Sequence, residues 1–459
     1  MPEARTPDSS GAPAPVTALC EEALEAWGQT ASALELGLAG PEFRARAGQV
    51  VLVPGPDGSP ARVILGLGPH PGDVSAFRTL AGRLPAGTFS LQGAPGGLDP
   101  TDAALAFALG LYRFERYKRR DAAPPRLVVP GADEASVTSI ASACALARDL
   151  INTPANDLGP AELEAAARDL AGRFGARIDV IVGEALLAKG YPAVHAVGRA
   201  AAPGREPRMI EITWGEADAP VVALVGKGVV FDTGGLDIKP SAGMRLMKKD
   251  MGGAAHVLAL GAMVMEAGLP VRLSILVPAV ENAIGGDAMR PGDVLATRKG
   301  LSVEVGNTDA EGRLILADAL TRATELRPDL TLDLATLTGA ARVALGPQLP
   351  PFFTDDEALA SAIEAGARKA QDPVWRLPLW KGYLPSLDSE IADLKNDPDA
   401  WAQAGAMTAA LFLQKFAPSG AWAHFDIFAW NPRGQPGSPS GGEAQAIRAL
   451  FAMLKARYT

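Results

Sequence analysis

Cysteine and histidine are scarce in this chain of 459 residues. Cys20 and Cys144 are the only two cysteines, and they show no spacing typical of a disulfide framework, a zinc site or a redox pair. So few cysteines are typical of a reducing cytosol, and we expect a cytoplasmic location. There are four histidines and none of them has the HExxH spacing, which argues against a histidine-based zinc site on a helix.

Long apolar runs and an excess of positive charge are also missing. No apolar run reaches the ~18 residues of a membrane-spanning helix, so no membrane insertion is expected. Residues 1–15 contain acids and prolines without the apolar core of a secretory signal, and we expect a flexible tail there. The net charge of −9 argues against nucleic-acid binding. The one basic run, within 113–120, is interpreted as cations ending a helix over 101–120, with a nucleic-acid patch as the alternative.

The length and the periodicity predict an α/β protein of more than one domain. Hydrophobic residues make up 48 % and charged residues 21 %, so the chain can bury a large core. We predict a smaller N-terminal α/β domain over 16–132, a linker helix over 133–155 and a larger C-terminal domain over 156–459. Strands that alternate with helices predict a mainly parallel or mixed central sheet flanked by helices in the larger domain.

The individual elements follow from runs of apolar residues and from turn signals. We predict strands over 62–68, 126–131, 177–182, 207–214, 220–226, 271–280 and 330–337. Helices are predicted over 160–174, over 243–267 and from 311 onward, with a hairpin near 293–306.

Charged residues interrupt the apolar segment VVALVGKGVVFDTGGLDIKPSAG at 221–243. Lys227 stands between two glycines at the end of a predicted strand, and Asp232 and Lys239 follow in a glycine-rich loop. Asp250 then stands at the entrance to the next apolar helix. Because open α/β sheets bind ligands beyond the carboxyl ends of their strands, we interpret these charges as parts of a site.

Two nucleotide-binding motifs do not fit this segment. A P-loop would need a glycine at position 221 and a serine or threonine after Lys227, but the chain has Val221 and Gly228 there. The stretch GKGVVF also lacks the third glycine of a dinucleotide fingerprint. We therefore expect no phosphate-binding loop.

A metal site fits the charges better. The segment NTDAEGRLILADAL (307–320) adds Asp309 and Glu311, which together with Asp232 and Asp250 make four acids. Four negative charges balance two divalent cations, and burial of four unpaired acids would be prohibitively unfavourable. Paired ions can also hold a water molecule and lower its pKa. The alternative is that each acid caps a helix, but capping does not explain the lysines beside the acids.

These segments resemble the signature sequences of the leucyl (cytosol) aminopeptidases, the M17 metallopeptidase family. The longest matches are 307–320, VGKGVVFDTGGLDIKP (225–240) and MKKDMGGAAHV (247–257). Shorter matches follow the same order, and the resemblance covers about 150–430. The N-terminal part is similar only through LYRFERYK (111–118).

The resemblance implies a hydrolase, specifically a metalloprotease whose catalytic domain is 156–459. It would act as an aminopeptidase on peptides with a free N-terminus, since a free amine can bind a metal whereas an internal peptide bond offers none. The resemblance also implies a cytoplasmic homohexamer. An architectural DNA-binding protein on the same scaffold and an inactive homologue are the alternatives. The side-chain preference stays open, because 401–413 and 428–444 depart from the family pattern.

Two metal ions per subunit are implied by the same resemblance. The tighter ion would be held by Lys227, Asp232, Asp250 and Glu311, and the exchangeable one by Asp232, Asp309 and Glu311. A lysine ligand must be neutral to offer a lone pair, so the cations would depress its pKa. We expect Mn²⁺ or Zn²⁺, and Mg²⁺ or Co²⁺ also suit an oxygen-rich set of ligands.

The remaining site residues are likewise implied by the resemblance. A water molecule bridging the two metal ions would attack the scissile carbonyl. Lys239 would polarise that carbonyl and stabilise the oxyanion that forms. Arg313 would hold a bicarbonate ion, the general base for that water. Substrate would contact Met247, Asn307, Leu337 and Gly339.

Overall fold

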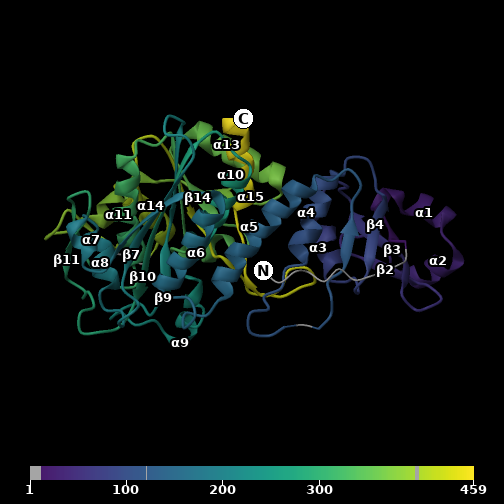
Figure 1. Cartoon of the computed structure of the whole chain (residues 1–459), viewed down its shortest axis with the longest axis horizontal. Coiled ribbons are helices and arrows are strands. Elements are labelled where there is room, and N and C mark those ends of the chain that lie inside the picture. Colours follow the sequence, from purple (N-terminus) through teal and green to yellow (C-terminus); the bar gives the residue numbers. More distant parts are fainter. Residues whose placement is uncertain (1–11, 120, 399–402) are drawn as a thin grey trace. The chain divides into compact units, whose positions relative to one another are not determined.

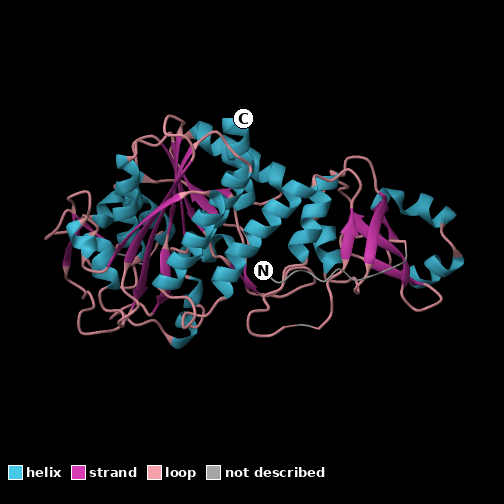
Figure 2. Cartoon of the chain, viewed as in Figure 1, coloured by secondary structure: helices cyan, strands magenta, loops and turns pink. Residues whose placement is uncertain are grey.

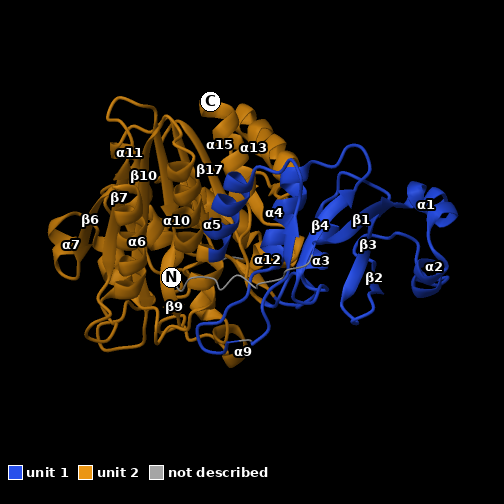
Figure 3. Cartoon of the chain, turned by 45° about the vertical axis from the view of Figure 1, so that its right-hand side comes forward, with its two compact units in different colours: residues 1–145, 432–440 blue, residues 146–431, 441–459 orange. Residues whose placement is uncertain are grey.

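The computed structural model describes residues 12–119, 121–398 and 403–459 and divides the chain into two compact units. Unit 1 consists of 1–145 and 432–440, and unit 2 of 146–431 and 441–459 (Figure 3). The first eleven residues of the expected tail lie outside the described residues. In the described part of the chain, every helix is too short or too polar to cross a membrane.

Unit 1 contains a five-stranded sheet in the order β2-β3-β1-β4-β5. All neighbouring strands are parallel except the antiparallel pair β2 and β3. The strands are β1 (Ala14–Cys20), β2 (Val50–Pro54), β3 (Pro60–Gly68), β4 (Thr88–Gly93) and β5 (Arg126–Val128). The helices are α1 (Leu24–Thr30), α2 (Ala33–Ala39), α3 (Ser75–Ala81) and α4 (Pro100–Gly110). The predicted strands 62–68 and 126–131 correspond to β3 and β5.

The helix predicted over 101–120 is wrong in its second half, because α4 ends at Gly110. Five cations crowd into residues 113–120, and like charges on neighbouring helical turns repel one another. The glycine at the last turn further weakens the helix. The basic run therefore follows the helix instead of ending it, and Arg120 lies outside the described residues.

Helix α5 (Glu134–Asn152) contains the boundary between the two units and falls where the linker helix was predicted. Unit 2 has a nine-stranded mixed sheet in the order β15-β14-β17-β13-β8-β10-β7-β6, with β9 paired to β10 (Figures 1 and 2). Its strands are β6 (Arg177–Val182), β7 (Arg208–Trp214), β8 (Val221–Gly226), β9 (Gly228–Asp232), β10 (Arg272–Asn282), β13 (Leu330–Ala335), β14 (Pro351–Phe353), β15 (Trp375–Arg376) and β17 (Ala421–Asp426).

The central strands of this sheet run parallel to their neighbours, in the order β10, β8, β13 and β17. The pairs β6–β7, β7–β10 and β14–β17 are antiparallel. Strand β8 is buried on both faces, which explains why its sequence is continuously apolar. The predicted α/β class with a mixed sheet flanked by helices is confirmed.

Helices cover both faces of the large sheet (Figure 2). One layer contains α6 (Pro160–Phe174), α10 (Gly252–Glu266), α13 (Glu357–Ala370) and α15 (Ile447–Tyr458). The other contains α8 (Pro192–Gly198), α11 (Gly312–Glu325) and α14 (Gly405–Gln414), which share one hydrophobic core with β8. Shorter helices are α7 (Ala185–Ala188), α9 (Ser241–Met244) and α12 (Gly339–Leu345).

The remaining strands form two small sheets. The hairpin predicted near 293–306 is present as β11 (Val294–Ala296) and β12 (Ser302–Glu304), and β12 also pairs with β16 (Leu394–Lys395). The second small sheet consists of β18 (Trp430–Asn431) and β19 (Gly441–Gly442).

The helix predicted over 243–267 consists of three pieces. Helix α9, a 3₁₀ turn at Met247–Lys249 and α10 follow one another with short breaks. Two consecutive glycines at the start of α10 weaken any continuous helix. The breaks leave Met247 and Asp250 in turns, where their side chains reach the site described next.

Candidate active site

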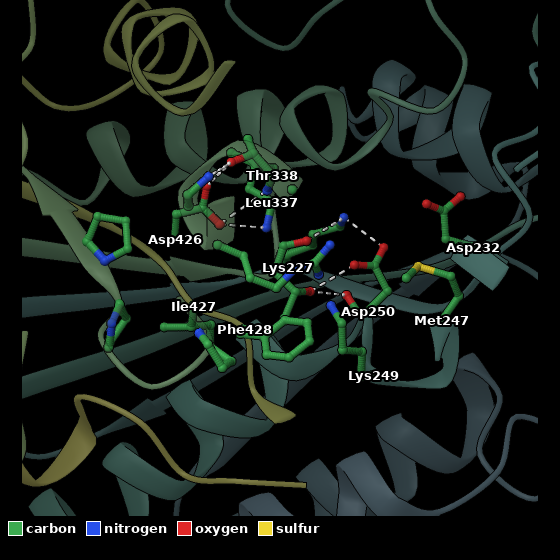
Figure 4. A pocket seen from close by; sticks show the side chains of 18 of the residues that line it. Lys227, Asp232, Met247, Lys249, Asp250, Leu337, Thr338, Asp426, Ile427 and Phe428 are labelled. Carbon is green, nitrogen blue, oxygen red and sulfur yellow. Dashed lines mark hydrogen bonds and ion pairs between the residues drawn. The ribbon is translucent and has the colours of Figure 1, made fainter. Parts of the chain in front are cut away.

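The candidate site lies in unit 2, at the carboxyl ends of the parallel strands. Lys227 joins β8 to β9, Asp232 ends β9 and Asp426 ends β17. Loops before α10 and α11 supply the remaining acids, and the loop after β13 forms another wall of the pocket (Figure 4). The position agrees with the rule that α/β sheets bind ligands where parallel strands end.

Lys227 is the centre of the first group of charges. Its Nζ lies 2.7 Å from Oδ2 of Asp250 and 2.9 Å from Oε1 of Glu311. All three residues are at most 3 % exposed. Burial alone would lower the pKa of Lys227, but the charges of Asp250 and Glu311 outweigh it and raise that pKa above its usual range. In the absence of other cations the lysine is therefore an ammonium that partly neutralises two acids.

Lys239 is the centre of a second group of charges. Its Nζ lies 2.8 Å from Oδ2 of Asp232 and also pairs with Oδ1 of Asp309. Carboxylate oxygens of Asp232, Asp309 and Glu311 lie within 4.8 Å of one another, a spacing at which they can share a metal ion. All five predicted metal ligands therefore converge on one place, together with Lys239.

The cluster contains more negative than positive charge. Burial, reinforced by the charge of Asp232, raises the pKa of Glu311 to about 8 and that of Asp309 to about 6. Among the described residues, Oε2 of Glu311 has neither a hydrogen bond nor an ion pair. A buried carboxylate oxygen without a partner is unfavourable unless a cation approaches it. The donor set of four carboxylates and an amine therefore fits divalent metal ions.

Two glycines leave room for the Lys227 side chain and backbone. A methyl group at Gly312, the first residue of α11, would lie 2.5 Å from Cε of Lys227. One at Gly253 would lie 2.0 Å from the carbonyl oxygen of Leu334 and 2.6 Å from the Lys227 nitrogen. The glycines in DAEGRL and DMGGAA thus let two helices approach the strand ends closely enough to bring Glu311 and Asp250 to the lysine.

Neutral polar side chains fix the acids in place. The Asn282 amide donates to Oδ1 of Asp232 at 2.8 Å, and the Thr336 hydroxyl donates to Oδ1 of Asp250 at 2.9 Å. The Thr308 hydroxyl donates to the carbonyl of Gly234 at 2.6 Å, which ties the loop after Asp232 to the loop that contains Asp309. Such outer contacts orient metal ligands and raise affinity for the ion.

Asp426 organises the loop after β13. Its Oδ1 accepts hydrogen bonds from the backbone N–H groups of Leu337 and Thr338, both at 3.1 Å, and Oδ2 accepts from the Thr338 hydroxyl at 2.6 Å. Leu337 and Gly339, both predicted to contact substrate, line the pocket on this loop. Burial raises the pKa of Asp426, although these donors and His424 oppose that effect.

Met247 and Lys249 line the pocket from the turn before α10. Met247, which is predicted to contact substrate, is half-buried at this wall. Lys249 is only 5 % exposed and its Nζ lies 5.1 Å from the centre of the Phe428 ring. Burial lowers the pKa of Lys249 to about 8, although the charges of Asp250 and Asp426 oppose that effect.

Arg313 and Asn307 are not among the residues lining this pocket. Arg313 is 6 % exposed, and its Nη1 donates to the carbonyl of Asn396 at 2.5 Å. Its Nε lacks a hydrogen-bond acceptor within the described part of the chain. Asn307 accepts the backbone N–H of Asp309 at 2.8 Å, and so shapes the loop that presents this acid.

Sequence reasoning missed three residues that the structure places at the site: Asp426, Lys249 and Asn396. The amide of Asn396 bonds the carbonyls of Asn307 and Ala310 and thereby holds the acidic loop. The sequence did contain two signals, namely Lys249 directly before Asp250 and Asp426 within the apolar stretch WAHFDI (422–427). Asn396 gave no local signal, because it contacts that loop from about ninety residues away in the chain.

Comparisons with known protein families agree with this geometry. Residues 145–451 match the model of the cytosol aminopeptidase family, catalytic domain, and residues 14–130 match the model of the M17 aminopeptidase N-terminal domain. A probable cytosol aminopeptidase of Syntrophotalea carbinolica is 41 % identical over 450 residues, which cover 90 % of this chain and 89 % of the relative. A probable cytosol aminopeptidase of Roseiflexus castenholzii is 43 % identical over 366 residues, covering 76 % and 74 %.

Solved structures share the whole architecture. The crystal structure of a cytosol aminopeptidase from Coxiella burnetii superposes with a TM-score of 0.92 at 45 % identity, covering 98 % of this chain and 99 % of the other. The bottromycin maturation enzyme BotP in complex with Mn superposes with a TM-score of 0.87 at 36 % identity, covering 98 % and 100 %. The resemblance inferred from the sequence is confirmed, including in the N-terminal part, where it had rested on one short stretch.

Proposed function

The chain belongs to the cytosol aminopeptidase family and is a metallo-exopeptidase, and we propose that it removes N-terminal amino acids from peptides with two metal ions per subunit. The observation that carries the two-metal proposal is the convergence of Lys227 and four acids, one of which keeps an unpartnered buried oxygen. When bound, the ions would act as Lewis acids and lower the pKa of a water molecule.

We assign the ligands as the sequence resemblance implies. Lys227, Asp232, Asp250 and Glu311 would hold one ion, and Asp232, Asp309 and Glu311 the other. Metal binding requires Lys227 to lose its proton, because an ammonium has no lone pair. The short contacts of Lys227 with Asp250 and Glu311 support this set, since the amine already points at the oxygens with which it would share an ion. The complex of BotP with Mn makes Mn²⁺ our first choice, with Zn²⁺, Mg²⁺ and Co²⁺ as further candidates.

Lys239 is proposed to act on the scissile carbonyl. It lines the pocket, is about 15 % exposed at its side chain, and stays charged because Asp232 and Glu311 outweigh the effect of burial on its pKa. As the carbonyl oxygen gains negative charge, Lys239 would donate a hydrogen bond to it and exchange one of its present carboxylate partners for the oxyanion.

Arg313 is proposed to hold a bicarbonate ion that accepts a proton from the attacking water. The support is the buried guanidinium whose Nε has no acceptor in the described part of the chain, since such a donor favours an anion beside it. Burial lowers the pKa of Arg313, yet arginine remains protonated in proteins. We further propose from the family that the enzyme is a cytoplasmic homohexamer.

We expect hydrolysis to depend on a free α-amine. Aminoacyl 4-nitroanilides should be cleaved by the Mn²⁺-loaded protein, and their N-acetylated forms should be cleaved at least about 10³-fold more slowly, because an acetylated nitrogen cannot bind a metal ion. Release of nitroaniline measures both rates. Chelation should abolish the activity and added Mn²⁺ should restore it. Comparable rates on blocked and free substrates would rule out recognition of the amine, and no hydrolysis at any metal concentration would overturn the proposed function.

Asp426 is expected to act as a positioning residue for the substrate loop. Asp426→Ala removes three hydrogen bonds to Leu337 and Thr338, so kcat/KM should fall about 10–100-fold, mostly through KM. Asp426→Asn keeps an Oδ1 acceptor for both backbone groups and should retain most of the activity. Metal content, measured by mass spectrometry, should be unchanged in both variants. Equal losses in the two variants, or loss of metal, would contradict a positioning role.

A further inference from the structure

The pocket contains a second positive region besides the two lysines that pair with the acids. Lys249 is 5 % exposed, and within the described part of the chain its ammonium has no hydrogen-bond acceptor or carboxylate in ion-pair contact. Its Nζ keeps some solvent access, so the ammonium is not fully desolvated. A lysine that lines a pocket without a paired carboxylate can donate to an anionic group of a ligand.

The contacts that Lys249 does make concentrate positive charge. Its Nζ lies 5.1 Å from the centre of the Phe428 ring, and Cζ of Arg342 lies 4.7 Å from the same ring. A cation–π contact attracts the ammonium to the ring face but does not satisfy its hydrogen-bond donors. Arg342 is exposed on α12 and also lines the pocket, so two cations share one wall beside Phe428 (Figure 4 shows Lys249 next to this ring).

The two acids nearest to this wall already have partners. Asp250 pairs with Lys227 and accepts from the Thr336 hydroxyl, and Asp426 accepts three hydrogen bonds from its loop. Neither carboxylate lies within ion-pair distance of Lys249. The wall can therefore offer positive charge and hydrogen-bond donors to a ligand.

We infer that Lys249 and Arg342 form an anion subsite that binds a carboxylate of the peptide substrate. The inference rests on the proposed function, since it concerns the pocket in which the peptide would lie. Two groups on a peptide have this chemistry: the side chain of an N-terminal glutamate or aspartate, and the terminal carboxylate of a dipeptide. A charge-assisted hydrogen bond in a desolvated pocket contributes ~1.5–3 kcal/mol, so the carboxylate should be recognised about 10–100-fold better than its amide.

Two pairs of substrates separate the two sources. Glutamyl and glutaminyl 4-nitroanilides differ only in a side-chain carboxylate, and leucylglycine and leucylglycinamide differ only in the terminal one. For each pair, kcat/KM is measured with the Mn²⁺-loaded full chain. The value for the acid is then divided by the value for the amide. This ratio does not depend on the fraction of active enzyme, so a variant that folds or binds metal less well still gives a valid answer.

Lys249→Met should lower the ratio of one pair about 10–100-fold, and the pair that responds identifies the carboxylate. Lys249→Arg keeps the charge and should hold the ratio within about threefold. The matched control is Lys248→Met, because Lys248 donates to the carbonyl of Asn152 and does not line the pocket. It should leave both ratios unchanged. Arg342→Gln should lower the same ratio by a smaller factor, about threefold, because its side chain is exposed.

The proposal of an anion subsite is wrong if Lys249→Met still cleaves neutral substrates and leaves both ratios within about twofold of the wild type. Should Lys249→Met prove inactive, Arg342→Gln alone decides in the same way. Failure of the proposed function has a different signature, namely that the wild-type protein cleaves none of the four substrates.

Discussion

Replacement of Glu311 by alanine is expected to abolish peptide hydrolysis and to lower the metal content of the protein. Glu311 is 1 % exposed, lies within 4.8 Å of Asp232 and Asp309, and contacts Lys227 at 2.9 Å. Glu311 thus lies between both groups of charges, and it is assigned to both ions in the proposed ligand set, as Asp232 is. As a ligand shared by two ions it would affect both, so we expect kcat to fall by about 10³-fold or more, which corresponds to ~4 kcal/mol.

Metal content provides a readout that does not require turnover. Mass spectrometry of the dialysed protein should find fewer than two Mn²⁺ per chain in the variant and two in the wild type. The matched control is Glu325→Ala at the opposite end of the same helix, where Glu325 pairs with Arg298 and Arg322 near the surface. That change should preserve metal and activity and alter stability by about 1 kcal/mol or less. Wild-type metal content in Glu311→Ala would refute the shared-ligand role.

The sequence was sufficient for the parts of the fold where local pattern and burial agree. The strands β6 and β8 and the helix α6 have the predicted bounds to within a residue, because each has a clear apolar pattern and a clear stop. The glycine after Phe174 ends α6 in a left-handed turn, and Pro160 starts it, both standard boundary residues. Local rules decide such elements without help from the rest of the chain.

Prediction failed where distant contacts decide. Nothing in residues 432–440 themselves shows that they cluster with unit 1 instead of with the domain around them in the sequence. The helix over 243–267 was predicted as continuous, but Gly253 packs against the backbone of Lys227 and Leu334, and this contact sets where α10 begins. Asp426 and Asn396 belong to the site only because the sheet and the acidic loop bring them there.

The acids were predictable for a physical reason. An ionised side chain inside an apolar segment is unfavourable unless something at the site compensates for it, so Asp232, Asp250 and Glu311 are conspicuous in the sequence. Their partners are ordinary polar residues, such as Asn282 and Thr336, which are unremarkable in any loop or strand. Sequence reasoning therefore finds the charges of a site more readily than the hydrogen bonds that orient them.

Replacement of Lys239 by alanine is expected to lower kcat by about 10²–10³-fold while both metal ions remain bound, because removal of one oxyanion donor has an effect of this size. Lys239 pairs with Asp232 and Asp309, but a cation that is not a ligand competes with metal for those acids. Its loss should therefore leave metal affinity unchanged or raise it. The effect should appear in kcat more than in KM, since the oxyanion exists only during the reaction.

Steady-state kinetics on aminoacyl 4-nitroanilides together with metal analysis separates the possible roles of Lys239. The control variant is Lys189→Ala, which removes an exposed lysine at the end of α7 and should change neither kcat nor metal content. Loss of metal in Lys239→Ala would make the lysine structural, because a residue that only repels cations cannot be needed to retain them. A large rise in KM with kcat unchanged would instead assign Lys239 to ground-state binding of the peptide, and the oxyanion role would be wrong.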